Sequence, residues 1–184
     1  MGESGGKWRE IYYLCRRITH LYIYMRFLGN IEAKIDTKGR AFLPSVFRKV
    51  LQASGEENLV LRKDAFQPCL VLYPESVWNQ QMDTIRQRLS RWNAAHQNLF
   101  RQFVADVEML TLDGNGRLLI PKQYLKKAEI EQSIKFIGMG DTIEIWRRDE
   151  DDKPFMEPEE FSKALEELMG NTFDSPNINY PERE

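Results

Sequence analysis

Two short segments of this sequence place an aspartate four residues before an arginine, with a glycine directly before the arginine. The first is Asp36-Thr-Lys-Gly-Arg-Ala-Phe-Leu-Pro44, and the second is Asp113-Gly-Asn-Gly-Arg-Leu-Leu-Ile-Pro121, 77 residues further along. Each glycine can adopt the positive φ of a tight turn, and each aspartate can accept hydrogen bonds within that turn. An arginine presented on such a turn can bond the O6 and N7 atoms of guanine, or a phosphate.

The same spacing also fits a structural role, in which the aspartate and arginine pair only to fix the turn. The duplication favours a shared use, because folding needs the glycine and proline in both copies but not an arginine at both Arg40 and Arg117. A calcium loop is excluded, since Arg117 and Leu118 stand at the fifth and sixth positions, where such a loop has an oxygen ligand and a glycine. A general acid–base role for Asp36 and Asp113 is disfavoured, because each has an arginine four residues on.

The duplication extends beyond these segments, as expected for a chain built from two copies of one fold. At the same offset of 77, apolar positions match: Ile35 with Leu112, Phe47 with Tyr124, and Leu59-Val60-Leu61 with Phe136-Ile137-Gly138. Residues 70–73 then match residues 143–146 at an offset of 73. We therefore expect that the second copy has lost four residues from one loop.

Each copy is predicted to form strands on both sides of its turn, then a short helix, then two more strands. The strands beside the turns are expected at about 30–36 and 40–43, and at about 107–113 and 117–120. Pro44 and Pro121 lack an N–H and suit the first turn of a helix. One copy of about 60 residues would be marginally stable alone. The copies are therefore expected to pack as one pseudo-symmetric α+β unit.

Two longer helices are predicted between the copies. The first has an apolar face formed by Trp78, Met82, Ile85 and Leu89. The second has an apolar face that includes Leu99 and Phe103. The second helix is expected to end before Val107, where the next strand begins. The predicted organisation is an N-terminal extension outside the fold, two copies with their helices, and a mobile acidic tail: residues 1–24, 25–90, 91–170 and 171–184.

Charge differs along the chain more than its net −2 suggests. Residues 27–148 carry 18 Lys/Arg and 14 Asp/Glu, whereas residues 149–184 carry three and 12. A nearly neutral chain is not a general DNA-coating protein, although a local basic face can bind DNA. An ordinary solvent-exposed surface explains the mild positive charge of residues 27–148, the body of the chain, equally well. In the acidic segment, apolar residues at helical spacing predict a helix near 158–169 that docks on the body.

The N-terminal segment is apolar and aromatic between Ile11 and Met25, but Arg16 and Arg17 interrupt it. No run reaches the ~20 apolar residues of a membrane-spanning helix, and no small-residue cleavage site is present. The simplest interpretation is that Met25 is a natural start and that residues 1–24 are an upstream extension. An amphipathic membrane anchor is the alternative.

The enzyme and metal signatures considered next are missing from the sequence. The sequence contains no G-x-S-x-G elbow, no phosphate-binding G-x-x-x-x-G-K-[ST] loop and no H-E-x-x-H motif. Cys15 and Cys69 are single and far apart, and neither His20 nor His96 has a partner at ligand spacing. We therefore expect no catalysis, no cofactor, no metal and no small-molecule ligand.

The paired motifs, with Met25-Arg-Phe-Leu-Gly at the start of the body, resemble the MraZ family of bacterial transcriptional regulators. The resemblance runs from Met25 to about Met169. It implies two SpoVT/AbrB-like domains that form swapped-hairpin β-barrels with peripheral helices. It also implies homo-oligomeric rings that bind short direct repeats in the promoter of their own operon, the division and cell wall cluster. The family's DNA contacts carry over to Asp36, Arg40, Asp113 and Arg117.

Several expectations follow from this resemblance. The partners would be double-stranded promoter DNA and further copies of the chain, in the cytoplasm and at the nucleoid, with no membrane. Lys38, Arg48 and Lys122 are candidate phosphate contacts, although a solvated surface explains each of them as well. Two rival functions stay open: a ring-forming protein scaffold without DNA binding, and an enzyme with an unrecognised site.

Overall fold

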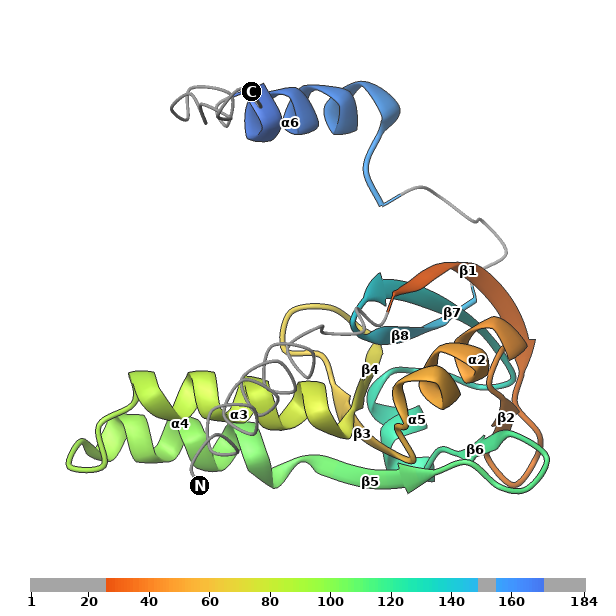
Figure 1. Ribbon diagram of the computed structural model, residues 1–184, viewed down its shortest axis with the longest axis horizontal. Helices are drawn as coiled ribbons and strands as arrows, with labels where there is room; N and C mark the ends of the chain where they lie inside the picture. Colours follow the sequence, from red (N-terminus) through yellow and green to blue (C-terminus); the bar gives the residue numbers. More distant parts are fainter. Residues whose placement is uncertain (1–25, 149–154, 171–184) are drawn as a thin grey trace, which may run out of the picture. The chain divides into compact units, whose positions relative to one another are not determined.

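The structure, a computed structural model, describes residues 26–148 and 155–170 (Figure 1). The predicted order of elements is confirmed in both copies. The first copy contains β1 (Phe27–Lys34), β2 (Arg40–Phe42), α2 (Ser45–Ser54), β3 (Asn58–Lys63) and β4 (Leu70–Pro74). The second contains β5 (Val107–Thr111), β6 (Arg117–Leu119), α5 (Lys122–Lys127), β7 (Ser133–Gly140) and β8 (Ile143–Arg147). Helices α2 and α5 both begin directly after a proline, as predicted.

The two copies are interlocked through their strands. A six-stranded antiparallel sheet has the order β1-β7-β8-β4-β3-β5, and a two-stranded sheet pairs β2 with β6. The first strand of each copy therefore pairs with the third strand of the other, which confirms the predicted swapped hairpins. The strand order also reads the same from both ends when the copies are exchanged. The pseudo-twofold axis passes between β4 and β8, where Val71 faces Glu144, and between β2 and β6, where Ala41 faces Leu118.

The register of the outer strands corrects one detail of the predicted alignment. Leu59 pairs with Leu110, and Ile134 pairs with Ala33. Since Leu110 lies 77 residues after Ala33, Leu59 corresponds to Ile134 at an offset of 75, and not to Phe136. The expectation that all four residues are missing from one loop is therefore wrong. Two are missing before β7, in the stretch that holds the shorter helix α5, and two between β7 and β8.

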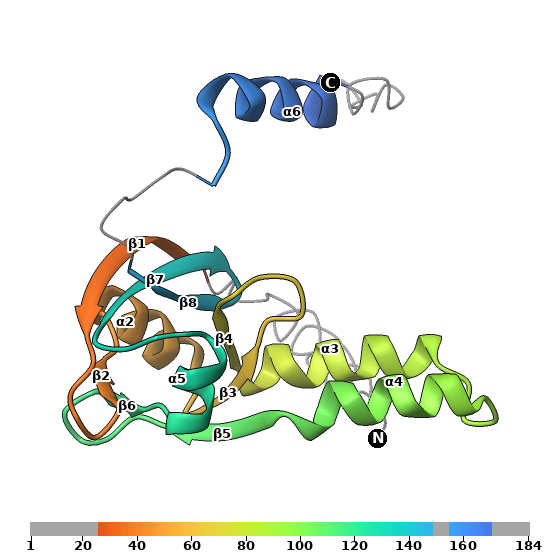
Figure 2. The ribbon, with the colours of Figure 1, turned by 180° about the vertical axis from the view of Figure 1, so that it is seen from behind.

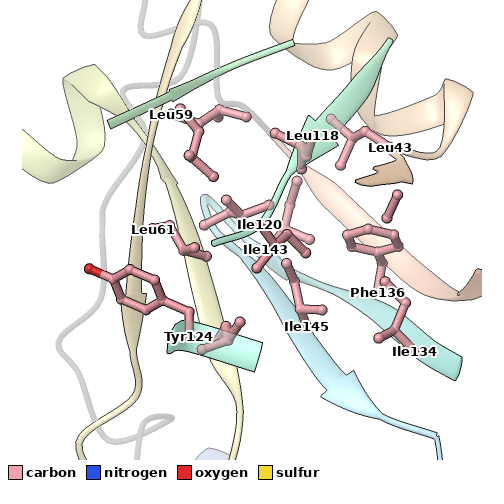
Figure 3. Packing of buried hydrophobic residues seen from close by; sticks show 14 of the residues in the cluster. Leu43, Leu59, Leu61, Leu118, Ile120, Tyr124, Ile134, Phe136, Ile143 and Ile145 are labelled. Atoms are coloured by element: carbon pink, nitrogen blue, oxygen red, sulfur yellow. The ribbon is translucent and has the colours of Figure 1, made fainter. Parts of the chain in front are cut away.

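The core lies between the two sheets and draws on both copies. Figure 3 shows Leu43 and Leu118, from the β2–β6 region, packed toward Phe136 and Ile134 of β7. All four side chains are almost completely buried. Phe47 of α2 meets Phe27 edge to face, with ring centroids 5.7 Å apart. Full burial of one such side chain contributes about 1.5–3 kcal/mol, so neither copy could keep this core without the other.

Helices α3 (Glu75–Arg88) and α4 (Ala94–Ala105) form a hairpin between the copies, visible beside the sheet in Figures 1 and 2. Trp78 of α3 is buried against Tyr73 and stacks on Phe103 of α4, with ring centroids 5.0 Å apart. Helix α4 ends two residues before Val107, as predicted. None of its side chains is fully buried, and Leu99 is 59% exposed. The hairpin thus covers one cluster of the core and leaves apolar surface open.

Helix α6 (Pro158–Gly170) confirms the helix predicted near 158–169 and is described by itself. It begins with two glutamates in its first turn, which suit the positive end of the helix dipole. Its docking on the body stays a prediction. The predicted extension 1–24 and the predicted mobile tail 171–184 lie outside the described residues. Across the described ranges, no helix is both long and apolar enough to cross a membrane.

Candidate nucleic-acid interface

The first turn is closed by the side chain of Asp36. Its Oδ1 atom accepts the backbone N–H groups of Lys38 and Arg40, each at 2.9 Å. Its Oδ2 atom accepts the Nε–H of Arg40 at 2.7 Å. Gly39 donates its N–H to the Asp36 carbonyl oxygen at 2.9 Å and has a φ of 87°, a value that side chains rarely tolerate. One carboxylate thus caps the turn and orients the arginine.

The second turn repeats this arrangement almost atom for atom. Asp113 Oδ1 accepts the backbone N–H groups of Asn115 and Arg117 at 2.9 Å, and Oδ2 accepts the Arg117 Nε–H at 2.7 Å. Gly116 has a φ of 78°. The predicted role of both aspartates as turn cap and local ion partner is therefore confirmed. Both arginine side chains stay partly exposed, so a ligand can still reach them while they pair with the aspartates.

The bonds within each turn lower the pKa of the aspartate. At Asp36, the hydrogen bond from the Arg40 side chain is the main cause, and it lowers the pKa from 3.8 to about 2. At Asp113, the backbone N–H of Arg117 is the largest contribution to a lowered pKa. Both carboxylates are ionised at neutral pH. The carboxylate of Asp36 engages Nε and Nη2 of Arg40, which leaves the N–H groups of Nη1 and the second N–H of Nη2 for a ligand.

The two turns end in one short β-ribbon. In the β2–β6 pair, Arg40 lies opposite Leu119, and Phe42 lies opposite Arg117. Side chains alternate across a strand, and the central pair is buried in the core. The other four side chains therefore share the outer side of the ribbon, here called the ribbon face: Arg40, Phe42, Arg117 and Leu119. In Figures 1 and 2 the ribbon and both turns lie at the end of the sheet away from the α3–α4 hairpin.

The ribbon face combines two charges with two large apolar groups. Phe42 is 57% exposed and Leu119 is 55% exposed. The guanidinium carbon of Arg117 lies 5.8 Å from the centroid of the Phe42 ring, within the range of a cation–π contact. A two-stranded ribbon is one of the two elements that the major groove of B-DNA admits. The face thus presents guanidinium donors on an element of the kind that this groove admits.

Metal and thiol chemistry find no comparable site in the described part of the chain. Within it, no group of three or more His, Cys, Asp or Glu residues could hold a metal ion. Cys69 is fully buried, and burial raises the pKa of its thiol to about 12. This thiol is therefore protonated and unreactive at neutral pH.

Comparison with known proteins also finds two successive matched segments in the chain. The family model described as "MraZ protein, putative antitoxin-like" matches residues 26–102 and then residues 103–171. The chain belongs to the MraZ family. Each of the two matched segments contains one complete Asp–Arg turn.

Relatives named "Transcriptional regulator MraZ" align over most of their length. The protein of Phocaeicola vulgatus is 66% identical over 146 residues, which cover 79% of this chain and 95% of the relative. The protein of Bacteroides thetaiotaomicron is 57% identical over 147 residues, 80% of this chain and 94% of the relative. The protein of Legionella pneumophila is 32% identical over 123 residues, 67% of this chain and 80% of the relative.

The structure brings the main predicted site residues of this MraZ chain together. Asp36 and Asp113 hold the two turns, and Arg40 and Arg117 share the ribbon face. Lys38 is exposed in the first turn. Lys122, the first residue of α5, is exposed as well. Their contacts with DNA stay predictions, but all these positions are accessible to a ligand.

Arg48 differs from this group, because its side chain is directed at the second turn. A Cβ atom added to Gly116 would lie 2.3 Å from Nη1 of Arg48, so the guanidinium fills the space beside that glycine. The Nε atom of Arg48 is buried without a hydrogen-bond partner. Arg48 is therefore a support of the second turn rather than an exposed surface charge.

Sequence reasoning missed Phe42 and Leu119 as members of the site. The signal was present in the alternation of each motif, since a residue two positions after an arginine on a strand points to the same side. The two-strand pairing between the motifs was needed to show that this side faces outward.

Proposed function

We propose that this chain is a transcriptional regulator that binds double-stranded DNA in a sequence-specific way through the ribbon face. The name of its relatives supports the regulatory role. The observation that carries DNA binding is the pair of aspartate-oriented arginines, Arg40 and Arg117, on the outer side of one two-stranded ribbon. Its function is binding rather than catalysis, in the cytoplasm at the nucleoid.

The ribbon would lie in the major groove. The free edge of each guanidinium then donates two hydrogen bonds to O6 and N7 of a guanine. Because Asp36 and Asp113 already hold the arginines, little side-chain freedom is lost when DNA binds. The exposed Lys38 and Lys122 would contact phosphates, which position the protein without reading sequence.

We further propose that several copies assemble into a ring and that adjacent subunits bind short direct repeats in the promoter of the chain's own operon, the division and cell wall cluster. The exposed apolar surface of α4, including Leu99, supports contacts between copies. In such a ring each ribbon can bind weakly, since later contacts benefit from a raised effective concentration. Light scattering at micromolar concentration should give a multiple of the 21.7 kDa chain mass, and a monomer mass would exclude the ring.

A second candidate is a ring-forming scaffold that binds protein and no DNA. The same apolar α4 surface favours it, because that surface fits a protein partner as well as another copy. A gel shift with DNA from upstream of the gene separates the two functions.

The decisive experiment compares Arg40→Ala and Arg117→Ala with the parent. Each bidentate contact to guanine is worth about 1–3 kcal/mol, so each variant should lose roughly fivefold to 150-fold in specific affinity. The melting temperature should stay nearly unchanged, because an exposed ion pair contributes little to stability. Arg91→Ala is the matched control, since Arg91 is exposed in the α3–α4 connection. Parental affinity in both variants would refute the proposal, and unfolding of both would show that the pairs only build the turns.

A further inference from the structure

The arginine contacts do not fully explain the two apolar side chains of the ribbon face, because Phe42 meets Arg117 and yet both Phe42 and Leu119 stay largely exposed. Phe42 and Leu119 occupy equivalent positions in the two copies, 77 residues apart, and more than half of each side chain is exposed. They alternate with the arginines across the ribbon, so any surface that the arginines touch must also meet them. Large exposed apolar groups at such a position indicate an apolar group on the ligand.

We propose that Phe42 and Leu119 contact the 5-methyl groups of thymines beside the guanines bound by the arginines. This inference rests on the proposed DNA binding. The thymine methyl is the apolar group that base edges present in the major groove, and phenylalanine is among the residues that contact it. The ribbon therefore reads both polar and apolar features of its site.

The geometry of the ribbon matches this combination. Directly opposite residues of an antiparallel pair have Cβ atoms about 4.5–5.5 Å apart. Successive base pairs lie about 3.4 Å apart along the helix axis. The pair Phe42–Arg117, with its guanidinium 5.8 Å from the ring, thus reaches the same or the next base pair. The pair Leu119–Arg40 does the same on the other side of the axis.

The difference between the two apolar residues also gives the ribbon a direction. Its backbone is symmetric about the Ala41–Leu118 pair, so identical side chains would fit DNA equally well in both orientations. Phe42 is larger than Leu119, and the ring is the group that contacts Arg117. Only one orientation places the ring against a given thymine. One ribbon therefore selects an unsymmetrical sequence, which suits sites repeated in the same direction.

The test removes a single methyl group from the DNA. A duplex selected by the full-length protein from a random library is remade with deoxyuridine at one thymine at a time, which removes only the methyl group. Loss of one buried methyl should weaken parental binding by about fourfold at the contacted positions. Phe42→Ala should bind the thymine and deoxyuridine duplexes equally at one position, and Leu119→Ala at another. Phe42→Leu should keep part of the discrimination.

Phe66→Ala is the control, because Phe66 is 92% exposed in the β3–β4 connection and should leave the deoxyuridine effect unchanged. Circular dichroism checks that every variant is folded. The inference is wrong if deoxyuridine has no effect on the parent, or if Phe42→Ala keeps the full effect. If the parent selects a sequence and needs Arg40 but ignores the methyl groups, only this inference fails. If the parent selects no sequence at all, the proposed function fails with it.

Discussion

The substitution Gly116→Ala tests how the second turn is supported. The three atoms nearest to a Cβ at this position all belong to Arg48, with Nη1 at 2.3 Å, Cδ at 2.7 Å and Cζ at 2.9 Å. The new methyl group must therefore displace the arginine. The equivalent residue of the other copy, Leu125, lies 3.7 Å from a Cβ at Gly39, which is an ordinary contact. A leucine at position 48 should thus accept the methyl group.

The expected loss of folding stability in Gly116→Ala has two parts. A non-glycine residue in the left-handed region costs about 1–2 kcal/mol, and the φ of 78° at Gly116 places it there. Forcing a group into filled space costs about 1–3 kcal/mol more. Gly116→Ala should therefore destabilise the parent by about 2–5 kcal/mol. In an Arg48→Leu background only the backbone part, about 1–2 kcal/mol, should remain.

Gly39→Ala provides the matched control. Its Cβ would lie 2.7 Å from the carbonyl oxygen of Ile120, a backbone atom, and the three atoms nearest to this Cβ include none of Arg48. Ile120 is held in place by the hydrogen bond from its N–H to the Gly39 carbonyl oxygen at 2.9 Å. The cost of Gly39→Ala should therefore be the same with arginine or leucine at position 48.

The assay is a pair of double-mutant cycles measured by urea denaturation at one protein concentration. Positions 116 and 48 should show a coupling of about 1–3 kcal/mol, and positions 39 and 48 a coupling below about 0.5 kcal/mol. An equal cost of Gly116→Ala in both backgrounds would refute this account of Arg48. A large coupling at Gly39 would show that the two turns are not independent.

Three further outcomes follow from charge. The pKa of Asp36 is lowered from 3.8 to about 2 in the folded chain, so as pH falls the unfolded chain binds this proton before the folded chain does. The ionised Asp36 carboxylate therefore stabilises the fold above about pH 4, and this contribution is lost toward pH 2. Asp36→Asn should remove this part of the acid sensitivity, measured as the shift in urea midpoint between pH 5 and pH 3. Lys38→Ala should reduce the slope of log K against log salt by about one without changing the selected sequence. Deleting residues 171–184 removes three acidic residues and one basic residue, so the gain in DNA affinity should be small at low salt and absent near ~0.2 M.

Much of the fold could be predicted because its signals are local. The Asp–Gly–Arg spacing specifies the two turns, and the prolines mark where α2 and α5 begin. Helix α4 ends at Ala105 because the next strand begins at Val107, as the apolar pattern indicated. The exchange of strands between copies was known only from the family resemblance, since no local pattern states which strand is the neighbour.

The predicted match of β3 with β7 differs by two residues from the structure for a simple physical reason. Offsets of 77 and 75 differ by two residues, which is one full period of side-chain alternation in a strand. Leu59 therefore faces the core whether it is matched with Phe136 or with Ile134, and both of those residues are completely buried. The apolar pattern is equally satisfied by both alignments. Only the pairing with Leu110 and Ala33 distinguishes them.

The pseudo-symmetry shows which parts of the interface are shared and which have diverged. The hydrogen bonds of the two turns agree to within about 0.1 Å, yet Arg48 supports one glycine and Leu125 the other. A buried Nε without a partner is costlier than an apolar contact, so packing alone would favour leucine in both copies. Arg48 adds a positive charge beside the Arg117 turn, where the ribbon also carries Phe42. The two differences fall on the same half of the interface, which therefore has two ends of unlike chemistry although its backbone is nearly symmetric.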